Sequence, residues 1–103
     1  MHNPTRIKKP SEKVPLGIDI KDIPPPIGET IQSGSSIVVV RMSDGVDVTT
    51  SIMVTGSLTI SGTQIKALFN SGTDGENYRI RFNCITQTCL YIEDIQLSVR
   101  DSV

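Results

Sequence analysis

The sequence is poor in the residues that build catalytic and metal centres. It contains one histidine, His2, two cysteines and no tryptophan among 103 residues. Because His2 lies in a polar stretch punctuated by proline, it offers no fixed base for a Ser-His-Asp or Cys-His arrangement. No Gly-Lys-Ser/Thr follows the glycine-rich stretches, so they do not form a phosphate-binding loop. We therefore expect no catalytic residue, no cofactor site, no metal ligand and no enzymatic activity.

Two acidic pairs carry the kind of oxygen ligands that calcium prefers, Asp44 with Asp47 and Asp74 with Glu76. Neither pair has the spacing of an EF-hand loop. Each pair also flanks a glycine, which explains the acidic residues as parts of turns. Turns are the favoured interpretation, and ion binding is the alternative.

The sequence also lacks a long apolar run and an excess of one charge. No stretch approaches the roughly 20 apolar residues that cross a bilayer, and no apolar segment of a signal peptide follows the basic N-terminus. Ten basic and eleven acidic side chains give a net charge of -1, so the chain as a whole does not attract nucleic acid or anionic lipid. We expect protein partners recognised by shape, with no nucleic acid and no membrane.

Basic side chains gather in residues 1–13, which hold four of them against one acidic residue, whereas the remainder holds six against ten. Pro4 and Pro10 favour an extended backbone there. We predict an extended basic N-terminal arm, 1–13, followed by one domain, 14–103. The arm's candidates for contacts with a neighbouring subunit are Arg6, Lys8 and Lys9. The alternative is a frayed terminus.

Apolar and polar residues alternate along most of the chain after the arm, which is the pattern of half-buried strands. Pro15 places the first strand at a sheet edge, because proline cannot donate to a ladder. Pro24, Pro25 and Pro26 form a stiff connector that excludes a helix or a central strand. The expected strands are residues 14–20, 37–42, 48–54, 58–60, 65–69, 78–84 and 90–99.

These short strands, separated by turn signals and without helical periodicity, predict an all-β fold. We expect an immunoglobulin-like antiparallel β-sandwich of about seven strands with the N-terminal arm, and a barrel is the competing architecture. Tyr78 follows Asp74 by four residues. This spacing is like that of the tyrosine corner of immunoglobulin folds, in which the hydroxyl returns to the upstream backbone.

The alternation also assigns faces to the strands. The clearest case puts Tyr78, Ile80, Phe82 and Cys84 in the core and their neighbours outside. In the earlier strand, Val38, Val40 and Met42 are expected on the core side because Arg41 belongs on the other. Two further candidate protein-contact residues share the outer face of the clearest strand, Arg79 and Arg81. Their alternative role is to keep a solvated face polar and discourage edge aggregation.

Two other residue types near the C-terminus allow alternative interpretations. A disulfide is conceivable if Cys84 and Cys89 face one another across the last predicted hairpin, but free thiols are favoured in a reducing cytoplasm. Of the four aromatic residues, Tyr91 is the one expected to be exposed as a platform for a sugar ring.

The segment from Ser71 to Ile80, Ser-Gly-Thr-Asp-Gly-Glu-Asn-Tyr-Arg-Ile, precedes a polar hairpin and the segment Ile95–Arg100, Ile-Gln-Leu-Ser-Val-Arg. This arrangement resembles the phage fiber-tail adaptor family. The segments 14–22 and 31–54 are also similar to that family, so the likeness spans most of the chain. Two departures are Ile20 in place of a tryptophan often seen in relatives, and no glycine in the hairpin at 86–88.

The resemblance implies an immunoglobulin-like structural protein of the virion, at the neck or tail. It implies an adaptor that joins tail fibres or neighbouring structural proteins to the head-tail connector, assembled in the host cytoplasm in many symmetric copies. Its expected partners are portal or connector, tail and fibre proteins. A capsid decoration (cement) protein is the first alternative, and a carbohydrate- or cell-surface-binding module is the second.

Overall fold

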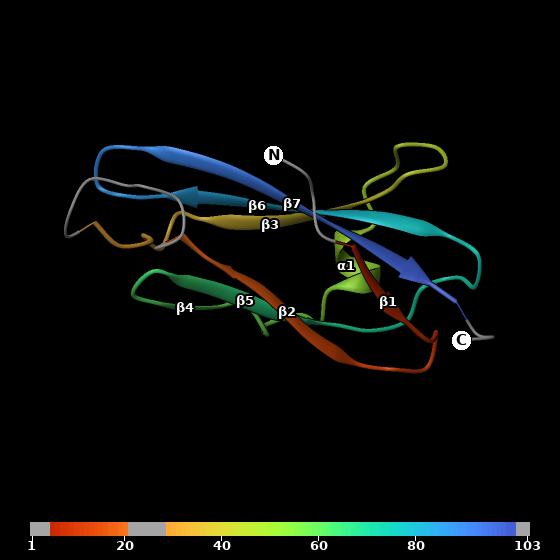
Figure 1. The fold of residues 1–103 in the computed structure, drawn as a ribbon. Coiled ribbons are helices and arrows are strands. Elements are labelled where there is room, and N and C mark those ends of the chain that lie inside the picture. The colour runs from red at the N-terminus through yellow and green to blue at the C-terminus, as the bar shows by residue number, and fades with distance from the viewer. Residues whose placement is uncertain (1–4, 21–28, 101–103) are drawn as a thin grey trace.

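The computed structural model describes residues 5–20 and 29–100. Seven strands and one short helix follow each other along these residues (Figure 1). They are β1 (Thr5–Lys8), β2 (Val14–Asp19), β3 (Ser36–Arg41), α1 (Thr49–Ile52), β4 (Thr59–Ser61), β5 (Gln64–Phe69), β6 (Asn77–Ile85) and β7 (Leu90–Val99).

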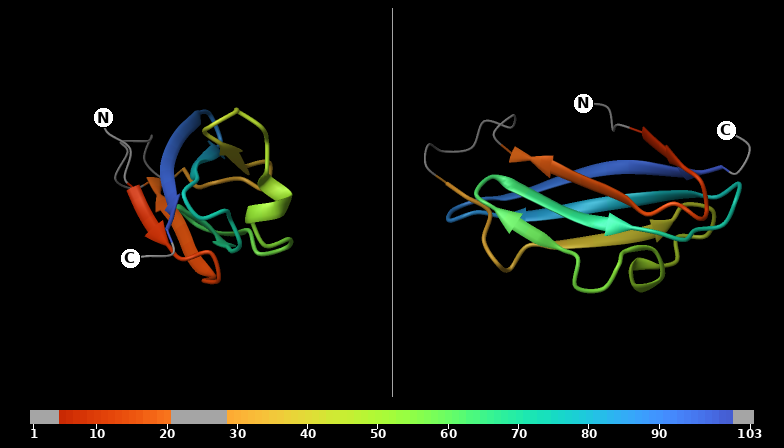
Figure 2. Two further views of the ribbon diagram at one scale, coloured as in Figure 1. Left: turned by 90° about the vertical axis from the view of Figure 1, so that its right-hand side faces the viewer. Right: turned by 90° about the horizontal axis from the view of Figure 1, so that it is seen from below.

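The strands form two stacked sheets, one with the order β1-β7-β6-β3 and one with the order β2-β5-β4 (Figures 1 and 2). β1 pairs with β7 in parallel, whereas the other ladders are antiparallel. The prediction of an all-β sandwich of about seven strands is confirmed. The immunoglobulin-like assignment stays a prediction.

The core lies between the sheets. β6 supplies it most regularly, because every second side chain from Tyr78 to Cys84 is buried and the residues between them are half-buried. This alternation confirms the predicted core face of β6. Phe69 of β5 is fully buried and belongs to the same apolar cluster.

The predicted core face of β3 is wrong. Ile37 and Val39 are buried, while Val38 and Val40 are half-buried on the outer side. The register explains the difference: Ile37 lies opposite Phe82 and Val39 opposite Ile80, and paired residues project to the same side of a sheet. Arg41 shares the inner side but ends the strand, where its guanidinium reaches Asp44.

The predicted strand over residues 48–54 is also wrong, because the short helix α1 replaces most of it. Thr49 explains this local structure: its hydroxyl donates to Asp47 and accepts the N–H of Val39 at 2.9 Å. The Val48 N–H donates to the Val39 carbonyl. The segment therefore covers the free edge of β3, while α1 buries Ile52.

Part of the expected arm belongs to the sandwich, because β1 extends the larger sheet beside β7. Lys8 is only 1% exposed. Its ammonium donates to the carbonyl oxygens of Lys9 at 2.8 Å and Glu12 at 3.0 Å. Burial lowers the pKa of Lys8, and the nearby Glu12 opposes that shift. The turn after β1 thus wraps around this side chain, and the chain then enters the second sheet as β2.

Tyr78 forms the hydrogen bond that its position predicts. The Thr73 N–H donates to the Tyr78 hydroxyl at 3.0 Å, and the ring is buried in the core. Gly72 allows the loop to pass close to Val99, because a Cβ atom at position 72 would lie only 2.8 Å from Val99 Cγ2. The φ angle of Gly72, +100°, is also one that other residues rarely adopt. The bond ties the loop before β6 to the core.

The cysteines do not face one another. Cys84 lies opposite Tyr91, whereas Cys89 lies in the hairpin turn, where its backbone bonds with Thr86. Both thiols are free, as favoured from the sequence. Burial is the main cause that raises the pKa of Cys84 to about 11, which makes its thiol a poor nucleophile.

Replacing Tyr78 with Phe should lower the free energy of unfolding by about 1–3 kcal/mol, because the substitution leaves the Thr73 N–H without its acceptor. Urea unfolding followed by circular dichroism measures the change. A stability equal to that of the wild type would show that the loop does not depend on this bond.

In the folded chain at pH 8, a thiol reagent such as DTNB should label Cys89 and leave Cys84 unlabelled, because Cys84 is buried and its thiol stays protonated. Mass spectrometry of the labelled peptides checks this. In urea both cysteines should react, and rapid labelling of Cys84 without urea would contradict the buried position.

Candidate docking surface

The two arginines predicted as contact residues lie on the outer face of the four-stranded sheet, on β6. Arg81 lies opposite Asp94 of β7. The guanidinium binds the carboxylate with two hydrogen bonds, Nε to Oδ1 at 2.9 Å and Nη2 to Oδ2 at 3.0 Å. The hydrogen bond from Arg81 holds the pKa of Asp94 below its usual value. Asp94 therefore balances the charge of Arg81 within the chain.

Arg79 lies between Gln96 of β7 and Val40 of β3 in the same face. Its Nε atom is buried and has no hydrogen-bond partner among the residues that the structure describes. Gln96 and Val40 carry no charge, and the nearby positive charge of Arg79 contributes, after that of Arg81, to the lowered pKa of Asp94. The structure therefore separates two arginines that the sequence presents as equivalent: Arg81 is engaged, and the Nε donor of Arg79 is not.

Three large aliphatic side chains are exposed on the same face, near the β6–β7 turn. Ile85 lies directly opposite Leu90, and Ile92 lies two residues beyond Leu90 on the same side of β7. Their exposed fractions are 39%, 59% and 51% for Ile85, Leu90 and Ile92. We call these three residues the hairpin patch. Sequence reasoning missed it, although the alternation around Tyr91 offers a signal, because it places Leu90 and Ile92 on one side.

The turn that carries the hairpin patch is held in place by Glu29. The hydroxyls of Thr86 and Thr88 donate to its carboxylate, and these bonds lower its pKa. The side-chain oxygen of Gln87 accepts the Thr30 N–H at 2.9 Å. The turn is thereby anchored to the segment that leads into β3.

The arm residues predicted as contacts differ in exposure. Arg6 and Lys9 are exposed. Lys8 is buried and bound to its own chain. Since β1 borders β7, Arg6 lies at the edge of the same sheet that carries Arg79 and Arg81.

The acidic residues of the turns have partners within the chain. Asp44 accepts hydrogen bonds from Arg41, Asp47 accepts from Thr49, and Glu76 accepts from Ser43. These hydrogen bonds lower the pKa values of Asp44 and Asp47. No group of three or more His, Cys, Asp or Glu residues that could hold a metal ion is found within residues 5–20 and 29–100.

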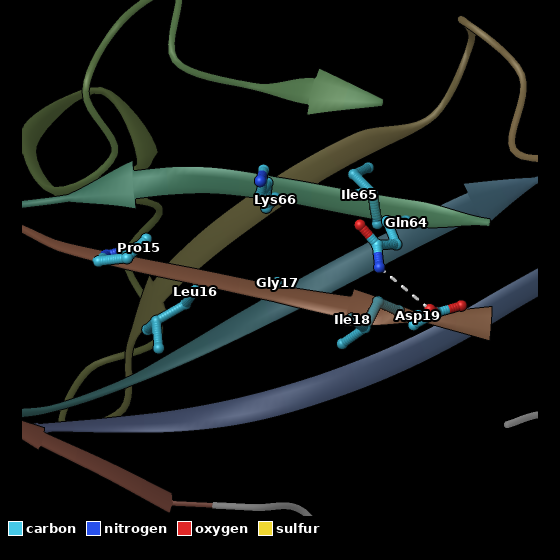
Figure 3. Close-up of a pocket in the computed structure, with 8 residues that line it drawn as sticks. All are labelled: Pro15, Leu16, Gly17, Ile18, Asp19, Gln64, Ile65 and Lys66. Carbon is cyan, nitrogen blue, oxygen red and sulfur yellow. Dashed lines mark hydrogen bonds between the residues drawn. The ribbon is translucent and has the colours of Figure 1, made fainter. Parts of the chain in front are cut away.

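A hollow of about 290 Å³ runs along β2 and β5 (Figure 3). It is lined by Pro15, Leu16, Gly17, Ile18, Asp19, Gln64, Ile65 and Lys66. The Asp19 carboxylate accepts hydrogen bonds from Thr63 and Gln64. The lining therefore offers apolar side chains, backbone, the amino group of Lys66 and the amide of Gln64, together with a carboxylate that is already engaged by Thr63 and Gln64.

Tyr91 is not the exposed platform expected from the sequence. It lies opposite the buried Cys84 and is half-buried against the apolar cluster. The pairing of β6 with β7 turns its ring toward the sandwich interior. The side chain on which the carbohydrate-binding alternative depended is therefore only partly exposed.

The model of the podophage GP4 fiber-tail adaptor protein gp77 family matches residues 8–97 of the chain. No curated protein and no solved structure matches it. Within the described part of the chain, no helix is both long and apolar enough to span a membrane. The family match begins at the last residue of β1 and ends in β7, so it includes the strands from β2 to β6, most of β7 and the whole hairpin patch. The resemblance found in the sequence is confirmed: this chain belongs to the podophage GP4 fiber-tail adaptor protein gp77 family and is a bacteriophage structural protein.

Proposed function

We propose that the chain joins tail fibres or neighbouring structural proteins to the head-tail connector of a phage particle. The observation that carries this proposal is the family match over residues 8–97. The sandwich supports it, because two sheets packed on a common core form a rigid body that displays fixed outer faces. Binding through such faces needs no chemical step, so the proposed role is docking without catalysis.

The proposed partners are the portal or connector proteins and the tail or fibre proteins. Many copies would be arranged around the symmetric axis of the particle, after assembly in the host cytoplasm. The residues proposed to contact partners are those of the predicted set with exposed or half-buried side chains, Arg6, Lys9, Arg79 and Arg81.

A capsid decoration protein is the second candidate function, because it also uses a small rigid sandwich, but at capsomer contacts and in far larger numbers. The tail-adaptor family favours the first function. The half-buried position of Tyr91 places the carbohydrate-binding module below both.

A phage that lacks this chain should form filled heads but lose its fibres, and supplying the wild-type chain should restore them. Electron microscopy of purified particles checks both results. With a tagged chain, density at the neck or tail is expected. Density distributed over the capsid would contradict the adaptor function and favour decoration.

Replacing both Arg6 and Lys9 with Glu should reduce incorporation into particles several-fold, because charges across an interface orient the encounter. These substitutions leave β1 and the buried Lys8 in place, unlike deletion of the arm. Lys13→Glu is the control, since Lys13 is also exposed and lies directly before β2. Quantitative mass spectrometry of particles measures the amount of each variant relative to the wild type. Equal incorporation of all variants would contradict a contact between Arg6 or Lys9 and a partner.

A further inference from the structure

We propose that two copies of the chain pair through the first half of β7, with Leu90 of each copy opposite Ile92 of the other. The pairing segment runs from Leu90 to Asp94, and we call it the free β7 edge. The pairing joins the four-stranded sheets of two copies into one continuous sheet. This inference concerns the free chain and goes beyond the adaptor function, on which it does not depend.

The free β7 edge exists because β7 is longer than the strand beside it. β7 has ten residues, whereas β1 has four and pairs only with residues 96–99 of β7 (Figure 1). The first half of β7 therefore has β6 on one side and, among the residues that the structure describes, no strand on the other. An uncovered length of strand is a template for pairing with another chain.

Two backbone hydrogen bonds show which groups face the free β7 edge. The Thr86 N–H donates to the Cys89 carbonyl, and the Val99 N–H donates to the Glu76 carbonyl. In an antiparallel ladder such bonds recur at every second residue, so the odd-numbered residues of β7 bond to β6. The N–H and C=O groups of the even-numbered residues point the other way. On the free β7 edge these residues are Leu90, Ile92 and Asp94.

Two of these residues also carry exposed apolar side chains. Leu90 is 59% exposed and Ile92 is 51% exposed. An antiparallel sheet that covers a core on one side normally presents polar side chains to water on the other, and adjacent exposed aliphatic side chains mark interaction sites. The free β7 edge thus combines outward backbone groups with uncovered apolar area. An extended strand satisfies both, because it bonds to the backbone and covers the side chains.

The other edges of the two sheets are short or blocked. β1 has four residues and β4 has three, and the Val48 N–H covers part of the β3 edge by donating to Val39. On β2, the Ile20 N–H donates to the carbonyl of Thr63, so by the same alternation Pro15 faces the open side, where it has no N–H to offer. Short strands and proline are common ways to block pairing at an edge.

A second copy matches the free β7 edge because this edge is complementary to itself. Identical edges meet with donors opposite acceptors when the two strands run antiparallel about a two-fold axis. With the axis at Tyr91, Leu90 of each copy lies opposite Ile92 of the other. The outward backbone groups of these two residues then bond reciprocally. Their side chains lie on the same face of the joined sheet, so each covers its counterpart.

The charges near the edge select this register over its neighbours. A shift of the axis to Ile92 sets Leu90 opposite the carboxylate of Asp94 in the other copy. A shift to Glu93 sets the two Glu93 side chains opposite each other. Like charges directly opposite are destabilising, and a carboxylate loses water when it covers an aliphatic side chain. The axis at Tyr91 avoids both conflicts and brings four aliphatic side chains together.

Pairing about a two-fold axis occupies the free β7 edge of both copies. Association therefore stops at two copies and does not grow into a filament. The edge is short, so we expect a weak dimer with a dissociation constant between about 1 µM and 1 mM. The dimer covers an edge that could otherwise pair with unrelated strands.

Analytical ultracentrifugation of the purified chain across this concentration range tests the pairing. The wild type should change from monomer to dimer as its concentration rises and should form nothing larger. Leu90→Asp should weaken dimerisation about tenfold, because it places a carboxylate against Ile92 of the other copy. A wild type that stays monomeric would leave the edge to a strand of another protein and overturn the proposal. Unchanged dimerisation of folded Leu90→Asp would overturn it as well.

Ile92→Pro tests the backbone contribution. It removes an N–H that faces outward and keeps the bonds between β6 and β7, so it should weaken dimerisation more than Ile92→Ala, which keeps that N–H. The control is the double variant Thr59→Asp with Lys66→Glu on the smaller sheet, where both residues are exposed and lie opposite each other. It should dimerise like the wild type. Circular dichroism shows which variants are folded, and if Ile92→Pro is not, Leu90→Asp decides the outcome.

Disulfide trapping tests the register. In chains that also carry Cys89→Ser, a mixture of Leu90→Cys and Ile92→Cys variants should form disulfides between the two variants faster than within either one, because only the mixed pair lies directly opposite. Gel electrophoresis without reductant, with one variant lengthened by a tag, separates the three products. Disulfides that form equally fast in all three combinations would overturn the proposed pairing.

Discussion

The antiparallel pairing of β6 with β7 is the interaction on which the other features depend. It joins the residues from Asn77 to Ile85 with those from Leu90 to Ser98 in an unbroken register. Because side chains alternate between the two sides of a strand, this one register assigns Tyr78, Ile80 and Phe82 to the core and the residues between them to the outer face. The other two strands of the sheet, β1 and β3, add to the edges of this hairpin.

The same register produces the chemistry of the outer face. It brings Asp94 opposite Arg81, where the two charges form a two-point ion pair, and it gives Arg79 the uncharged Gln96. It also brings Ile85 opposite Leu90 near the turn. A shift by one residue would exchange the two faces, so the core that stabilises the domain and the surface proposed to bind a partner are consequences of one pairing.

The connections make this hairpin suitable for a structural role. Glu29 fixes its turn through Thr86 and Thr88, and the Tyr78 hydroxyl fixes the loop at its other end through Thr73. Two anchored ends limit the motion of the strands between them. A surface that is already ordered loses little conformational entropy on binding, which suits the docking role proposed for this chain.

The sequence by itself determined the β-sandwich, the core face of β6, the role of Tyr78 and the resemblance to the family, because each depends on local alternation, spacing or motif.

Tertiary structure decided the rest. Ile37 to Val40 are all apolar and β-branched, so their faces depended on the partner strand. Within residues 48–54, α1 (Thr49–Ile52) formed in place of a strand because the edge of β3 offered backbone groups to Thr49 and Val48. Lys8 entered the interior because the next turn supplied carbonyl oxygens for its ammonium. Arg79 and Arg81 look alike in the sequence, and only the residues facing them across β7 give one a partner and leave the other's Nε without one.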